Sequence, residues 1–114
     1  MTYGVTMTYV QNYTPQDLDR PDVEAIDGPA VIEFGTNWCG HCQAAQPAIR
    51  EAFETYPGVR HLKVEDGKGR RLGRAFGVKL WPTLVFLKNG QDIEKLVRPG
   101  SSQPIELALN RIAD

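Results

Sequence analysis

Residues 30–42 have the sequence AVIEFGTNWCGHC. The first five of these residues form a compact apolar run that only Glu33 interrupts and that Gly35 ends. A run of this kind predicts a strand that is buried on both faces. Cys39 and Cys42 follow a few residues later, so the two thiols come directly after a buried element.

The residues after the first cysteine have the pattern of a helix. From Gly40 to about Tyr56 apolar side chains recur at helical spacing, and Pro57-Gly58 ends the pattern. Pro47 lies inside this helix, where it removes one backbone hydrogen bond and should kink the helix. The two cysteines are therefore expected to open a helix.

Strands and helices alternate along the rest of the chain, and no repeat, linker or low-complexity tract divides it. We expect one domain over residues 1–114, with the weakest pattern, an N-terminal strand and helix, in residues 1–29. The order of the elements predicts an α/β fold with a mixed central β-sheet flanked by helices on both faces. The expected strands cover residues 3–10, 59–64, 83–87 and 92–97, a hairpin turn covers 88–91, a short first helix begins at Thr14-Pro15, and two further helices cover 67–76 and 101–112. The last helix is expected to bury Ile105, Leu107, Leu109 and Ile112.

The composition indicates a globular domain, because 41% of the 114 residues are hydrophobic and 24% are charged. Thirteen Lys plus Arg against fourteen Asp plus Glu give a formal net charge of -1, so no overall field favours nucleic acid or an anionic membrane. The N-terminus lacks the pattern of a secretory signal, and no apolar run is long enough to span a bilayer. We expect a cytoplasmic protein, and a monomer, that binds neither nucleic acid nor membrane.

The chain has only two cysteines, and their spacing indicates redox chemistry rather than a structural role. A disulfide between them would close a very short loop and would contribute little to stability. At a helix start the first sulfur lies beside unpaired backbone N–H groups, which stabilise a thiolate at Cys39 and make it the nucleophile. Cys42 would then resolve the mixed disulfide. His41 stands between the two cysteines, where an imidazole can stabilise the thiolate and make the pair more oxidising.

Glu33 stands six residues before Cys39 on the predicted buried strand, where its neighbours predict an apolar side chain. Burial should raise the pKa of its carboxyl group. A carboxyl group beneath Cys42 could accept the proton of that thiol, directly or through a water molecule. In the alternative interpretation, Glu33 reaches solvent or pairs with Lys63.

Two further patterns have an ordinary explanation. The two cysteines and the two histidines, His41 and His61, could bind zinc, but a structural zinc site needs four ligands in a tetrahedral arrangement and His41 lies within the same tight turn as the cysteines. We therefore expect no metal, and we expect His61 to be an ordinary polar residue on a strand. The basic residues of the segment 68–74 recur at helical spacing, which is typical of a solvated helix face.

Residues 31–42 resemble the active-site strand and loop of the thioredoxin family. Further positions are similar to features of that family: Pro47 matches a proline of the active-site helix, Trp81-Pro82-Thr83 a cis-proline loop, residues 86–90 the closing hairpin, and Gly100 a glycine on the substrate side. The resemblance runs from about residue 30 to the C-terminus, and it implies a thioredoxin fold.

The resemblance also implies a site. It implies redox cycling of the two cysteines, a cis bond before Pro82, pairing of the substrate backbone with the residues around Trp81, and a charge at Lys63 that tunes Glu33. Together with the residues discussed above, this gives Cys39, Cys42, Glu33 and His41 as catalytic candidates, Trp38, Gly40, Trp81, Pro82, Thr83 and Gly100 as substrate-binding candidates, and Lys63 as a tuning residue.

The chain also departs from standard thioredoxins. Gly40-His41 between the cysteines resembles protein disulfide isomerase domains, and Glu33 replaces the more usual aspartate. Gln43 stands where both groups commonly carry lysine, and Trp81 is bulkier than the usual residue before the cis-proline. The first two departures favour isomerase-like tuning of the cysteine pair.

The predicted function is reduction of protein disulfides through a reversible dithiol formed by Cys39 and Cys42. The partners would be disulfide-containing proteins and an external thiol or reductase as electron donor, and no cofactor is expected. Reduction follows from the expected cytoplasmic location, because the same pair in an oxidising compartment would donate its disulfide. Two alternatives stay open: a disulfide isomerase or oxidase, and a non-catalytic binding module that holds a partner on the surface of Trp38, Trp81 and Pro82.

Overall fold

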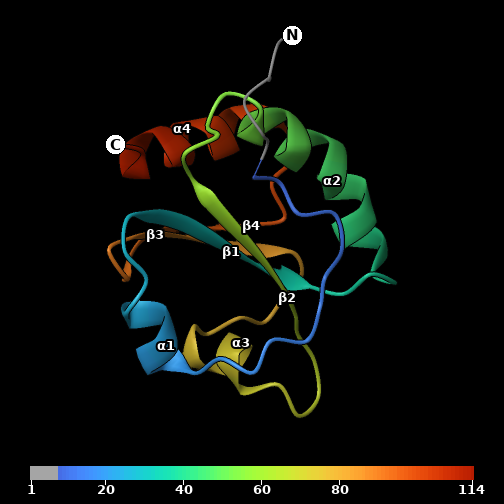
Figure 1. The fold of residues 1–114 in the computed structure, drawn as a ribbon. Helices are drawn as coiled ribbons and strands as arrows, with labels where there is room; N and C mark the ends of the chain where they lie inside the picture. Colours follow the sequence, from blue (N-terminus) through green and yellow to red (C-terminus); the bar gives the residue numbers. More distant parts are fainter. Residues whose placement is uncertain (1–7) are drawn as a thin grey trace, which may run out of the picture.

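The computed structural model describes residues 8–114, which form a four-stranded sheet and the helices around it (Figure 1). The strands lie in the order β2-β1-β3-β4, with β1 parallel to β2 and the other two pairs antiparallel. The predicted α/β class and mixed sheet are confirmed. The elements are α1 (Arg20–Glu24), β1 (Pro29–Gly35), α2 (Gly40–Phe53), β2 (Arg60–Glu65), α3 (Arg71–Ala75), β3 (Thr83–Lys88), β4 (Gln91–Val97) and α4 (Ser102–Ile112).

Helices cover both faces of the sheet, as predicted (Figure 1). One buried core joins α2 and α4 to the face of β1 that carries Val31, and a second core joins α1 and α3 to the face that carries Ile32 and Phe34. Because side chains alternate along a strand, Glu33 and Gly35 lie on the same face as Val31. The one acid of the central strand therefore points toward α2, the helix that the cysteines open.

The first helix differs from the prediction. Thr14 does not cap a helix; its backbone instead pairs with β2, with Glu65 N donating to Thr14 O at 2.9 Å and an isolated parallel bridge to Val64. The helix begins at Arg20, where Asp19 and Asp22 form a reciprocal capping box. The expected strand over 3–10 lies largely outside the described residues, and residues 8–10 are not in a strand.

The later elements lie close to their predicted positions. The hairpin between β3 and β4, the second strand and the C-terminal helix are confirmed within one or two residues. The third helix is shorter than predicted and starts at Arg71, because Gly67 and Gly69 have φ values of 126° and 83° that no helix can contain. Leu107 is 63% exposed and not in the core; Ala108 takes the inward position, which keeps helical spacing with Ile105 and Leu109.

Candidate active site

The two cysteines lie at the start of α2, as predicted. Cys39 is the N-cap residue, and its Sγ accepts a hydrogen bond from the backbone N–H of Cys42 at 3.3 Å. Both cysteines are free thiols in this structure, and they are 7% and 1% exposed. The first sulfur therefore faces the unpaired N–H groups of the helix end, and the second lies one turn inward.

Gly35, the last residue of β1, provides the space in which the inner sulfur lies. A Cβ atom at this position would lie 2.6 Å from Cys42 Sγ, 2.7 Å from Tyr13 Cζ and 2.8 Å from Tyr13 Oη. Cβ atoms in proteins essentially never show such short distances, so any larger residue at this position would force Cys42 or Tyr13 to shift. The sulfur of Cys42 and the hydroxyl group of Tyr13 therefore share the space that the missing side chain leaves.

Tyr13, which no sequence pattern indicated, connects this space to Glu33. The Tyr13 hydroxyl group donates to Glu33 Oε2. The tyrosine backbone is fixed by Asn37, whose side chain accepts from Tyr13 N at 2.8 Å and donates to Tyr13 O at 3.0 Å. Burial, and then the charge of Glu33, raise the pKa of Tyr13 far above its ordinary value. The phenol therefore keeps its proton and holds it against the carboxylate.

His61 is the second site residue that the sequence did not indicate: it lies on a strand, β2, as predicted, but its side chain is buried against Glu33 and is not that of an ordinary polar strand residue. The ring is buried and stacks on Phe53, with the two ring centroids 4.5 Å apart. Its Nε2 lies 2.9 Å from Glu33 Oε1, and its Nδ1 accepts from the backbone N–H of Val10 at 2.8 Å. Because Nδ1 accepts, we assign the single ring proton to Nε2, which donates it to Glu33.

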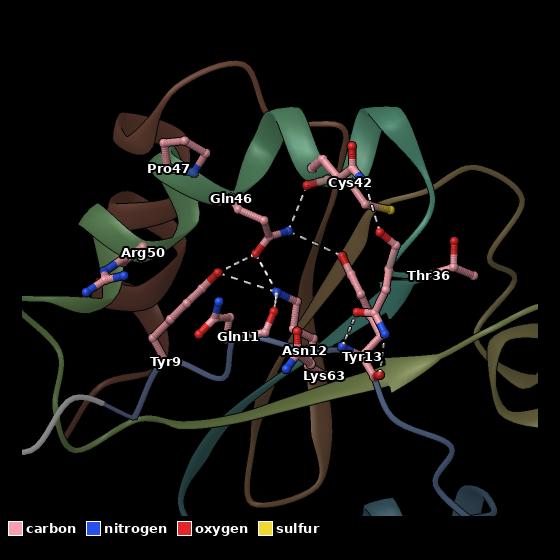
Figure 2. A pocket seen from close by; sticks show the side chains of 12 residues that line it. Tyr9, Gln11, Asn12, Tyr13, Thr36, Cys42, Gln46, Pro47, Arg50 and Lys63 are labelled. Carbon is pink, nitrogen blue, oxygen red and sulfur yellow. Dashed lines mark hydrogen bonds between the residues drawn. The ribbon is translucent and has the colours of Figure 1, made fainter.

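Gln46 and Lys63 complete the surroundings of Glu33 (Figure 2). The Gln46 side-chain amide donates to Glu33 Oε2 at 2.9 Å and to the carbonyl group of Cys42 at 2.8 Å. Lys63 Nζ donates to Gln46 Oε1 at 2.5 Å and lies 4.0 Å from Glu33 Oε2, so the predicted pairing of lysine and acid is present as a long ion pair. Burial lowers the pKa of Lys63, although Glu33 and Cys42 counteract it.

These residues border a pocket beside α2. It has a volume of about 540 Å³, and Figure 2 shows the side chain of Gln46 between those of Tyr9 and Tyr13, with dashed lines to both. Cys42 also lines the pocket. The pocket therefore borders Cys42 together with Tyr13, Gln46 and Lys63.

The pKa of Glu33 corrects the sequence-based expectation. Burial alone raises the pKa, as expected, but the hydrogen bond from His61, the charge of Lys63 and the hydrogen bond from Tyr13 together outweigh it. The pKa of Glu33 therefore lies below its ordinary value, and the group is ionised at neutral pH. The sequence indicated the burial of this residue and its pairing with Lys63, but not its hydrogen bonds with His61 and Tyr13.

Cys42 has the opposite shift. Burial, followed by the hydrogen bond with the Cys39 sulfur, raises the pKa of Cys42 to about 11, while the Thr36 backbone and the Tyr13 hydroxyl group lower it. The inner thiol is therefore protonated at neutral pH, and it must lose a proton before it can attack.

The predicted substrate-binding residues lie on the outer side of Cys39. Trp38 is 76% exposed and meets Trp81 edge-on, with ring centroids 5.7 Å apart. The predicted cis bond between Trp81 and Pro82 is confirmed, and Trp81 Nε1 donates to Asp66 at 2.9 Å. The hydroxyl group of Thr83 is turned inward onto the Leu80 carbonyl group at 2.6 Å.

Three remaining candidates occupy the first turn of α2 and the loop before α4. Gly40 and His41 are exposed next to Cys39, and Gly100 is exposed across a groove that it lines together with His41. The structure thus brings His41 and Gly100 together, and Trp38 and Trp81 together, as two neighbouring parts of one surface.

The structure also bears on metal sites and on membrane-spanning helices. Within residues 8–114 no three or more His, Cys, Asp or Glu side chains gather as a metal site would require. No helix in this described part of the chain has the length and apolar character needed to cross a membrane.

Comparisons with known proteins agree with this geometry. The thioredoxin family model matches residues 10–111. The thioredoxin Asp f 28 of Aspergillus fumigatus is 35% identical over 86 residues, which are 75% of this chain and 80% of that protein. The solved structure of thioredoxin 2 from Pseudomonas aeruginosa PAO1 in its reduced form is 53% identical, has a TM-score of 0.81, and is covered over 90% of this chain and 94% of that chain.

Proposed function

Because this chain belongs to the thioredoxin family, has the thioredoxin fold and is a protein-disulfide reductase, we propose the following roles for its residues. The Cys39 thiolate attacks one sulfur of a substrate disulfide, that S–S bond breaks, and the departing substrate sulfur takes up a proton from solvent. Cys42 then attacks Cys39 Sγ, which forms the Cys39–Cys42 bond and releases the second substrate thiol. Two electrons pass to the substrate, and an external thiol or reductase restores the dithiol.

The second step requires a proton acceptor, and we assign that role to Glu33 acting through Tyr13. As the Cys42 thiol loses its proton to Tyr13 Oη, the tyrosine passes its own proton to Glu33 Oε2. One observation carries this proposal: Cys42 Sγ and Tyr13 Oη lie 2.6 and 2.8 Å from the point where a Cβ atom of residue 35 would stand, and Tyr13 already donates to Glu33. This path replaces the water molecule that the sequence-based hypothesis allowed.

The low pKa of Glu33 makes it a ready but weak acceptor. At neutral pH it is ionised and free to take a proton, yet it returns the proton easily because His61, Gln46 and Lys63 stabilise the charged form. We propose His61 and Lys63 as positioning and tuning residues, with no direct contact to substrate. His41, exposed beside Cys39, would tune the outer thiol instead.

We further propose that the chain acts as a monomer in the cytoplasm on disulfide-containing proteins, without a cofactor, and that Trp38, Gly40, Trp81, Pro82, Thr83 and Gly100 border the substrate. The cytoplasmic location is supported by the cysteine content, since the only two cysteines are the redox pair. The Trp38–Trp81 pair beside Cys39 supports the substrate surface, because exposed aromatic side chains provide contact area next to the reacting sulfur.

Serine variants test the roles of the two sulfurs. With an insulin-type protein disulfide as substrate, Cys39→Ser should abolish turnover, whereas Cys42→Ser should accumulate a mixed disulfide that mass spectrometry of trapped complexes detects. Equal residual turnover in both variants would contradict the assignment of Cys39 as the nucleophile and Cys42 as the resolving thiol. A binding module would still bind its partner when Cys39→Ser and Cys42→Ser are combined, and neither single variant would form a covalent complex.

His41 favours a second candidate function, disulfide isomerisation or oxidation, because an imidazole between the cysteines makes the pair more oxidising. The reduction potential of the pair, equilibrated in glutathione or dithiol buffers and read by thiol alkylation, separates the candidates. A value near about -270 mV supports a reductase, and one near about -180 mV supports an isomerase or oxidase.

A further inference from the structure

A second cavity lies between α2 and the loop that joins β4 to α4. It has a volume of about 240 Å³, and its lining combines the methyl groups of Ala44, Ala45 and Ala48 with His41, Arg98 and Gly100. The two polar side chains of this lining, His41 and Arg98, are both basic. The groove therefore offers a small apolar floor with positive charge at its edge.

Arg98 is held in this place by an unusual backbone. Its φ is 49°, a left-handed conformation that side-chain-bearing residues rarely adopt. Its backbone N–H donates to the Pro82 carbonyl group at 2.9 Å, and its Nε donates to the Trp81 carbonyl group at 2.8 Å. Both bonds attach the arginine to the turn beside the cysteines, so the guanidinium group is fixed before any substrate arrives.

The charge of Arg98 is not neutralised within the described part of the chain. Arg20, Arg70 and Arg111 each form an ion pair with a nearby carboxylate, but among residues 8–114 no acid lies within ion-pair distance of Arg98. The groove lining contains no Asp or Glu. The terminal N–H groups of Arg98 therefore lack a carboxylate partner, and a carboxylate is the group that an arginine binds best.

The groove is close to the reacting sulfur. His41 follows Cys39 by two residues on the first turn of α2, and Trp81, whose carbonyl group Arg98 holds, packs against the cluster of Cys39 and Cys42. A substrate chain whose cysteine reaches Cys39 would place a neighbouring residue over this groove.

We infer that Arg98 makes this groove recognise an acidic side chain next to the target cysteine of a protein disulfide. This rests on the reductase function proposed above and names its substrate class. The methyl groups of the floor would contact the aliphatic part of a glutamate, and the guanidinium group would bind its carboxylate. Arg98 acts here in substrate selection and has no part in the thiol chemistry.

The test uses three synthetic peptides, each closed by one intramolecular disulfide, which carry Glu, Gln or Lys on both sides of one cysteine. The second-order rate of reduction by the reduced full chain is measured by its tryptophan fluorescence, and each rate is divided by the rate with dithiothreitol to remove differences in intrinsic reactivity. At about 50 mM salt the Glu peptide should react about five- to tenfold faster than the Lys peptide, and about 0.5 M salt should reduce that ratio, because exposed ion pairs are modest and screened.

The ratio within each variant, rather than its overall rate, decides the outcome. Arg98→Gln and Arg98→Gly should both bring the Glu-to-Lys ratio to within about twofold of one, and the glycine variant suits the positive φ, so it guards against a folding defect. Arg98→Lys should retain part of the preference. Arg74→Gln, which removes an exposed charge from α3 on the opposite face of the sheet, should keep the full ratio.

A wild-type ratio near one at low salt, or a ratio that survives Arg98→Gln, overturns the inference. Failure to reduce any of the three peptides would instead remove the proposed reductase function, so the two failures are distinguishable.

Discussion

Cys39 and Cys42 belong to one turn of α2, yet the regions around them differ in almost every physical respect. Around Cys39 lie the exposed ring of Trp38, the half-buried ring of Trp81 and the exposed, unneutralised charge of Arg98. Around Cys42 lies a buried set of hydrogen-bonded groups that centres on Glu33. If the proposed roles hold, the fold separates substrate recognition from proton handling, and a separation of three residues along the chain is enough to divide the two tasks.

The largest expected effect concerns the proton-handling region. Tyr13→Phe removes the hydroxyl group between Cys42 and Glu33 and keeps the ring, so release of the second substrate thiol should slow by about a hundredfold, the ordinary range for loss of acid–base assistance. The first attack by Cys39 should be unchanged. Single-turnover kinetics with separate detection of the two released thiols measures both steps.

Tyr56→Phe is the matched control for this change, because Tyr56 packs at the edge of the core near the far end of α2. It should leave both steps at their wild-type rates. If Tyr13→Phe slows the first attack as much as the second step, the two regions are not separate and the relay is wrong.

A smaller effect follows from filling the space beside Gly35. Gly35→Ala would place a Cβ atom 2.6 Å from Cys42 Sγ, so the sulfur and Tyr13 must move apart. We expect a loss of about 1–3 kcal/mol in the free energy of unfolding, as for other overpacked sites, and a second step at least about tenfold slower. Denaturant unfolding and single-turnover kinetics measure the two quantities.

Gly58→Ala provides the control, since a Cβ atom there meets nothing within 4 Å. Its stability should stay within about 0.5 kcal/mol of the wild type. A Gly35→Ala protein that is as stable and as active as Gly58→Ala would contradict the crowded arrangement of Cys42 and Tyr13.

The pH dependence of Cys42 sharpens the comparison further. In Cys39→Ser, the alkylation of Cys42 should have a midpoint between the ordinary 9.0 and about 11, because burial still raises the pKa while the contribution of the Cys39 sulfur is gone. Adding Tyr13→Phe should move the midpoint upward, since Tyr13 lowers the pKa of Cys42. Iodoacetamide rates from pH 7 to about 12 provide the measurement, and a downward shift would show that the hydroxyl group does not stabilise the thiolate.

The smallest effect is expected in acid. Since the folded-state pKa of Glu33 lies below the ordinary 4.5, its charge stabilises the fold above that pH, and this stabilisation is lost as the pH falls from 4.5 through the folded-state pKa. As the pH falls through this window, the free energy of unfolding of Glu33→Gln should therefore decrease less than that of the wild type. Urea unfolding between pH 3 and 6 measures it, and parallel curves for the two proteins would show that Glu33 does not titrate as described.

The sequence predicted the features that depend on local pattern. The strand before the cysteines, the helix that they open, the hairpin and the residues of the outer surface are visible in apolar spacing, turn residues and family resemblance. The pairing of Glu33 with Lys63 could be proposed because both lie on predicted buried strands, and the register of β1 and β2 places them opposite each other.

What the sequence did not predict depends on contacts between distant segments. Tyr13 and Val10 reach the site only because the segment before α1 lies along β2, and the helix-start pattern at Thr14-Pro15 concealed this arrangement. His61 looked ordinary because its contact with Glu33 depends on the register of β1 and β2. That register places His61 opposite Val31, on the same face of the sheet as Glu33. Arg98 was missed because a positive φ at an arginine has no signature in sequence.

The attachment of the segment before α1 has a practical side for anyone who labels this protein. Residues 10–14 join β2 through Val10 and Thr14, and they join Glu33 of β1 through Tyr13. A bulky fusion partner on that side is therefore expected to disturb the redox centre. The other end of the chain follows α4 and lies beside Pro29 and Pro57, at the start of β1 and away from the cysteines (Figure 1). A fluorescent reporter or an affinity handle therefore belongs after Asp114, where it leaves both thiols in their native surroundings.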